Sequence, residues 1–106
     1  MTLEDLPLDS EGFLTDLSLW NEDVASLLAD QDSIELSPQH FEIIHLIRKF
    51  YQEHQVSIAN RPLVKLVKNE LGAEKGSSIY LMQLFPESPA KFAAKIAGLP
   101  KPANCL

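Results

Sequence analysis

Helix start and stop signals divide this chain into short segments and constrain its fold more than any other feature. Ser37 and Ser88 are each followed directly by a proline. A serine side chain can accept from the unpaired amides of a first helical turn, and proline fits the first helical position because no amide proton is needed there. Gly72 and Gly98 each follow an apolar periodic stretch, where glycine commonly ends a helix. The sequence therefore predicts a series of short helices.

The apolar spacing between these signals predicts about five helices. In the longest segment Phe41, Ile44 and Ile47 recur at helical spacing, so that helix is expected to bury one stripe. The expected helices begin after the cap Asn21 and then cover residues 38 to about 54, 60–71, 79–84 and 90–97. The predicted fold class is mainly α, a small helical bundle in one domain over residues 1–106. Its expected parts are a hairpin region 1–17, a helical core 21–97 and a C-terminal arm 98–106.

The residue pattern of the N-terminal region, residues 1–17, predicts a small β-hairpin. Asp9, Ser10, Glu11 and Gly12 form a cluster of turn residues between two apolar flanks. Trp20 follows this region directly before the cap of the first helix and is expected to anchor the core.

The only cysteine, Cys105, lies next to the C-terminal residue. A single cysteine cannot form a disulfide within the chain, and chain ends pack weakly, so this thiol is either incidental or reacts with an outside partner. Pro100 and Pro102 favour an extended conformation, so residues 98–106 predict a mobile arm with the thiol at its tip. A chain end supplies no fixed base or oxyanion site, so Cys105 is better suited to carry a group into a partner's site than to form a complete active site. Lys101 can stabilise the Cys105 thiolate if the arm folds back.

Charge is distributed unevenly along the chain, whose formal net charge is −6. No lysine or arginine precedes Arg48, and residues 48–106 hold all 9 basic residues. This asymmetry either affects only solubility and the steering of association, or it provides a basic face that binds an acidic partner. Tight direct binding to nucleic acid is disfavoured, because it needs clustered cations and a basic domain. If the face serves a partner, the candidate binding residues are Arg61, Lys65, Lys68 and Lys101.

Two other site types are weighed and disfavoured. His40, His45 and His54 with Cys105 could hold zinc, but their spacings match no compact helical pair, so no metal is expected. All three histidines are expected on or near the surface, and His40 could serve the first turn of its helix. A helix-turn-helix formed by the second and third helices is disfavoured because the connector, residues 55–60, is longer than the usual turn.

The chain shows no sign of export or membrane insertion. Its acidic start, residues 1–5, lacks the basic and apolar regions of a secretory signal, and no apolar run approaches the ~20 residues of a membrane span. A cytoplasmic protein with a reduced thiol is expected.

Four sequence blocks carry a resemblance to a known family. Residues 90–105 read AKFAAKIAGLPKPANC, residues 9–14 DSEGFL, residues 36–41 LSPQHF and residues 84–90 LFPESPA. Together these blocks resemble the DsrC/TusE family of sulfur-relay proteins over essentially the whole chain. The resemblance implies a mainly helical fold with an N-terminal hairpin and a mobile C-terminal arm, with Cys105 as the sulfur carrier.

One position separates the two branches of this family. DsrC proper has a second cysteine where this chain has Ala94, so the pattern is similar to TusE. That similarity implies a sulfurtransferase without cofactor that takes persulfide sulfur from a TusBCD-type complex. The sulfur would pass to an MnmA-type tRNA 2-thiouridylase, with its tRNA, for the wobble uridine. Two alternatives stay open: a single-cysteine DsrC-like protein in sulfur trafficking or regulation of dissimilatory sulfur metabolism, and an interaction domain whose cysteine is incidental.

Overall fold

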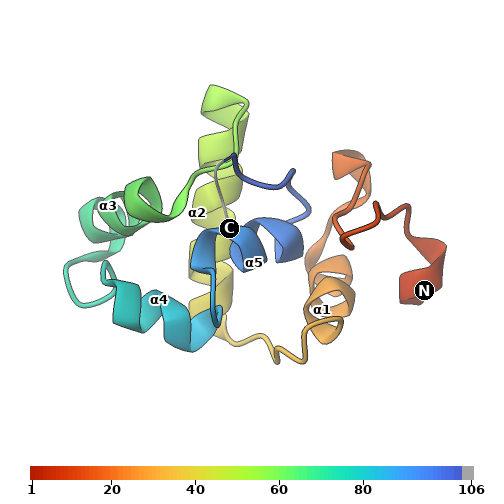
Figure 1. The fold of residues 1–106 in the computed structure, drawn as a ribbon, viewed down its shortest axis with the longest axis horizontal. Helices are drawn as coiled ribbons and strands as arrows, with labels where there is room; N and C mark the ends of the chain where they lie inside the picture. The colour runs from red at the N-terminus through yellow and green to blue at the C-terminus, as the bar shows by residue number, and fades with distance from the viewer. Residues whose placement is uncertain (104–106) are drawn as a thin grey trace.

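The protein is built from helices joined by loops, which follow an irregular N-terminal segment, as Figure 1 shows. The structure is a computed structural model and describes residues 1–103. Within this range the elements are the 3₁₀ turns η1 (Leu3–Asp5) and η2 (Leu17–Leu19) and the helices α1 (Glu22–Asp30), α2 (Pro38–His54), α3 (Asn60–Leu71), α4 (Ser78–Leu84) and α5 (Pro89–Ile96). The five predicted helices are confirmed, and the predicted bounds of the last four lie within about a residue of those observed.

Local capping explains where the helices begin. The Asn21 side chain accepts from the Val24 amide at 2.8 Å, and the Ser77 hydroxyl accepts from the Tyr80 amide at 3.1 Å. Pro38 and Pro89 occupy first helical positions, as the serine–proline pairs predict.

His40 is a capping residue and is buried, which corrects the expectation that all three histidines lie near the surface. It is only 8% exposed. Its Nδ1 accepts from the Ser37 amide at 3.0 Å, so its Nε2 donates to the Leu84 carbonyl, 2.8 Å away at the end of α4. Both ring nitrogens are thus used inside the protein. His45 and His54 are exposed, as expected.

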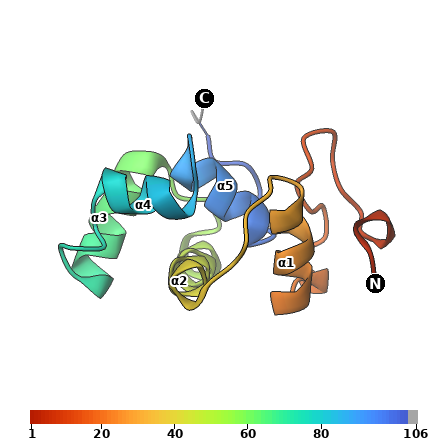
Figure 2. The ribbon, with the colours of Figure 1, turned by 90° about the horizontal axis from the view of Figure 1, so that it is seen from below.

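Helix α5 lies at the centre of the arrangement. Figures 1 and 2 show it over α2, with α1 on one side and α3 and α4 on the other, and it packs against all four helices. Ala93, Ala94 and Ile96 of α5 are buried, and the small alanine side chains allow close approach of the neighbouring helices. The underlying α2 contributes Ile43 and Ile44 to the same core. The position of α5 therefore depends on every other helix.

The structure does not show the predicted N-terminal β-hairpin. Residues 1–103 contain no β-strand, and the two flanks meet at a single antiparallel bridge between Leu8 and Leu14. The turn itself forms, because the Asp9 carboxylate accepts from the amides of Glu11 and Phe13, each at 2.9 Å. The ladder stops there because Pro7 has no amide proton to donate and because the flanks instead form η1 and η2.

Candidate functional site

A glycine turn fixes the direction in which the chain leaves α5. The Gly98 amide donates to the Lys95 carbonyl at 3.2 Å, and the Leu99 amide donates to the Ala94 carbonyl at 2.9 Å. This pair of bonds is a Schellman motif, which needs a left-handed residue, and Gly98 has φ +72°. Leu99 then enters the core with 2% exposure. The arm therefore starts from a defined geometry.

Two side chains from distant parts of the sequence hold the end of α5. Trp20 Nε1 donates to the Ile96 carbonyl at 2.9 Å, and an Arg48 guanidinium nitrogen donates to the Ala97 carbonyl at 2.6 Å. The Arg48 guanidinium also stacks over the Trp20 ring, 4.0 Å from its centroid, in a cation–π contact. Partial burial lowers the pKa of Arg48 from its usual value. These contacts satisfy helix-end carbonyls that would otherwise have no partner.

Arg48 is a site residue that the sequence pattern does not reveal. Trp20 was correctly expected to be a structural anchor. No local signal marks Arg48, because its partner Ala97 lies 49 residues further along the chain.

The described part of the predicted arm lies against the domain. The Ser57 hydroxyl donates to the Pro100 carbonyl at 2.6 Å, and Lys101 forms an ion pair with Glu11 at 3.0 Å. Pro102 is buried. Residues 98–103 thus follow the surface of the helices, and Cys105, the predicted sulfur carrier, lies outside the described residues. The mobility of the arm stays a prediction.

The predicted partner-binding cations fall into two groups. Arg61, Lys65 and Lys68 are exposed on α3 and share one face, because they are spaced by four and three residues. Lys101 instead pairs with Glu11 of the N-terminal segment, a segment that Figure 1 shows on the other side of the molecule from α3. The structure therefore does not unite all four cations.

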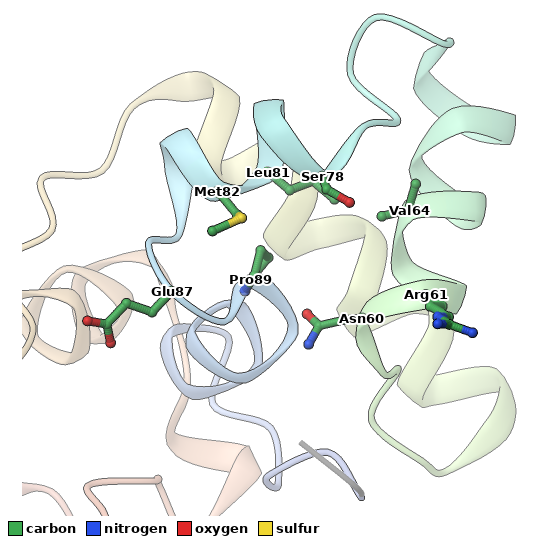
Figure 3. Close-up of a pocket in the computed structure, with 8 residues that line it drawn as sticks. All are labelled: Asn60, Arg61, Val64, Ser78, Leu81, Met82, Glu87 and Pro89. Carbon is green, nitrogen blue, oxygen red and sulfur yellow. The ribbon is translucent and has the colours of Figure 1, made fainter. Parts of the chain in front are cut away.

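An apolar groove lies beside the α3 cations. Its volume is about 350 Å³, and it is bounded by α3, α4 and the start of α5 (Figure 3). The Asn60 side chain accepts from the Ala90 amide at 2.8 Å and ties the first turn of α3 to that of α5. The lining residues are Asn60, Arg61, Val64, Ser78, Leu81, Met82, Glu87 and Pro89. Sequence reasoning did not find this groove, because its walls come from three helices separated along the chain.

Known proteins match this chain along nearly its whole length. The family model described as DsrC like protein matches residues 1–106. The chain belongs to the DsrC-like family. A sulfurtransferase TusE homolog of Haemophilus influenzae is 54% identical over 98 residues, which cover 92% of this chain and 90% of that protein. The sulfurtransferase TusE of Escherichia coli is 48% identical over 103 residues, 97% of this chain and 94% of that protein.

Solved structures of this family have the same arrangement of helices. The DsrC structure of Allochromatium vinosum matches with a TM-score of 0.86 at 46% identity, covering 95% of this chain and 90% of that chain. The expected resemblance and the mainly helical fold are thus confirmed. Position 94, where the resemblance places the second cysteine of DsrC proper, holds a buried alanine in α5. Within residues 1–103 no helix is long and apolar enough to cross a membrane.

Proposed function

We propose that this protein is a sulfur carrier in a tRNA 2-thiolation relay and that Cys105 carries the sulfur as a persulfide. The observation that carries the proposal is a lone cysteine on a segment whose base is built into a DsrC-like fold. Relatives up to 54% identical that bear the name sulfurtransferase TusE support the same assignment. A cytoplasmic location fits, because the thiol stays reduced there.

The transfer is a thiol exchange in two equivalent steps. The Cys105 thiolate attacks the terminal sulfur of a persulfide on the donor, the sulfur–sulfur bond of the donor breaks, and the donor cysteine leaves as a thiolate. Cys105 then holds a persulfide of its own. A cysteine thiolate of the acceptor attacks the terminal sulfur in the same way and releases the Cys105 thiolate. No external oxidant or reductant is consumed in either step.

The partners in this proposal are a TusBCD-type donor complex and an MnmA-type tRNA 2-thiouridylase with its tRNA. Thiol exchange requires access to the sulfur and a deprotonated thiol more than it requires a cleft. The contacts of Trp20, Arg48 and Ser57 set the direction of the arm, and the cations Arg61, Lys65, Lys68 and Lys101 contribute to docking. No metal or cofactor takes part.

The alternative role in dissimilatory sulfur metabolism has less support. A disulfide within one chain needs two cysteines, and Cys105 is the only cysteine here. The curated relatives with the TusE name also cover nearly the whole chain.

Intact-mass spectrometry tests the carrier role. The protein is incubated with a cysteine desulfurase, free cysteine and the donor complex, and the added mass of one sulfur atom is expected on the wild type. The Cys105→Ser variant is the control and is expected to gain none. Absence of added sulfur on the wild type, or equal addition on the variant, would remove the carrier proposal.

A further inference from the structure

Helix α4 exposes apolar side chains next to the groove of Figure 3. Ile79 is 75% exposed and Met82 is 46% exposed, while Leu81 of the same helix is fully buried. Ile79 and Met82 are three residues apart and therefore share one side of the helix. Met82 and Leu81 also line the groove, together with Val64 and Pro89. Apolar side chains gathered around a concave surface typically mark a site of interaction.

The α3 rim of this groove is basic. Arg61 lines the groove, and Lys65 and Lys68 follow it along the exposed face of α3. The exposed α4 residues Ile79 and Met82 carry no charge, and Figure 3 shows Glu87 on the opposite side of the groove from Arg61. The groove is therefore an apolar hollow with positive charge along one side, although the whole chain has a net charge of −6.

The groove adjoins the base of the arm. Ser57, which holds Pro100 at 2.6 Å, is followed three residues later by Asn60, which lines the groove. Three residues of extended chain span at most about 11 Å, so a protein seated in the groove lies beside the arm. Asn60 also fixes the first turn of α5, whose other end carries the arm. The groove and the base of the arm are thus held by the same part of the chain, residues 57–60.

We propose that the groove is the docking site for the sulfur donor, which inserts a protruding apolar side chain flanked by acidic residues. This inference rests on the proposed carrier function and names the surface that serves it. The apolar hollow receives the side chain, Met82 adapts to its shape, and Arg61 and Lys65 pair with the flanking carboxylates. The position of the groove brings the donor's persulfide to the arm.

The positive charge on the α3 rim favours the donor, over the thiouridylase or tRNA, as the partner bound in the groove. A tRNA thiouridylase binds phosphates and needs a basic surface near its substrate, which the α3 cations would repel. The donor has no nucleic-acid substrate and is free to present an acidic surface. Direct binding of tRNA to this face is disfavoured, because the hollow and the exposed Ile79 and Met82 offer nothing to phosphates.

The test compares the affinity of the donor complex for single variants of the full chain. Met82→Glu places a charge in the groove and is expected to weaken binding at least tenfold. Its matched control is Leu19→Glu, because Leu19 is 44% exposed and belongs to η2 on another part of the molecule. Arg61→Glu is expected to weaken binding and to reduce its dependence on salt, with Lys49→Glu of α2 as the control. Unchanged thermal midpoints show that each variant is folded.

Sulfur loading separates this inference from the carrier proposal. At saturating donor, Met82→Glu is expected to gain sulfur at the wild-type rate, so only the apparent KM rises. If Met82→Glu and Leu19→Glu bind donor equally well while wild type still gains sulfur, the groove inference is wrong and the carrier proposal stands. If wild type gains no sulfur, the carrier proposal itself fails. If the Arg61→Glu variant binds tRNA more weakly than the wild type but binds the donor equally well, the inference is also wrong, and the α3 face binds RNA instead.

Discussion

The substitution Gly98→Ala tests the geometry at the base of the arm. A Cβ atom at residue 98 would lie 2.6 Å from Cδ1 of Trp20, so the indole ring must move. The residue also has φ +72°, where a side chain costs about 1–2 kcal/mol. Displacing the ring breaks the bond from Trp20 Nε1 to the Ile96 carbonyl, which contributes about 1 kcal/mol.

The expected net loss is about 2 kcal/mol of unfolding free energy. Alanine restricts the unfolded chain, which offsets the loss by about 0.5 kcal/mol. For a domain of this size, a 2 kcal/mol loss lowers the thermal midpoint by roughly 10 °C. Urea unfolding followed by circular dichroism measures the free energy. The fluorescence of Trp20, the only tryptophan, reports on the folded state and is expected to change because its ring is displaced.

Gly72→Ala is the matched control for this prediction. Gly72 also has positive φ, +101°, but a Cβ atom there would have no neighbour within 4 Å. That variant is expected to lose stability through backbone strain alone and to keep the wild-type emission of Trp20. The reasoning is refuted if Gly98→Ala loses less than about 0.5 kcal/mol, or if its Trp20 emission equals that of the wild type.

Three further substitutions test the contacts around α5 and the arm. Arg48→Met removes the hydrogen bond to the Ala97 carbonyl and the contact with the Trp20 indole. Urea unfolding is expected to show a loss of about 2 kcal/mol in unfolding free energy, and an unchanged unfolding midpoint contradicts this. Lys95 forms an ion pair with Asp32 at 3.0 Å, so Lys95→Met leaves the Asp32 carboxylate without its partner. Calorimetry is expected to show a loss of about 3 kcal/mol in unfolding free energy. The double variant Asp32→Asn with Lys95→Met is expected to recover part of this loss. Ser57→Ala frees the Pro100 carbonyl, so NMR relaxation is expected to show faster motion at the amides of Leu99, Lys101 and Ala103; identical relaxation argues against this anchor.

The helices could be predicted because their determinants are local. Ser37, Pro38 and Asn21 act within one turn of their own helices, so the residue types and their order are sufficient. The N-terminal flanks carry a correct turn signal around Asp9 but no clean alternation, and the structure accordingly forms one bridge instead of a hairpin.

The long-range contacts that hold the ends of α4 and α5 could not be predicted in the same way. His40, Trp20 and Arg48 bond to carbonyls that lie 44, 76 and 49 residues away. A backbone carbonyl has no residue-specific signal in the sequence, so only the assembled fold reveals these partners. The groove likewise requires three helices to meet. The exposure of the α3 cations could be inferred from the helical spacing, whereas the role of Cys105 stays a prediction because it lies outside residues 1–103.

A reconstituted relay tests whether Cys105 carries the sulfur that reaches the tRNA. Purified desulfurase, donor complex, this protein, thiouridylase and tRNA are combined, and 2-thiouridine is quantified by mass spectrometry of the digested tRNA. The carrier account predicts thiolation that depends on this protein and is abolished by Cys105→Ser added at the same concentration. Equal rates of 2-thiouridine formation with the wild type and Cys105→Ser would contradict it.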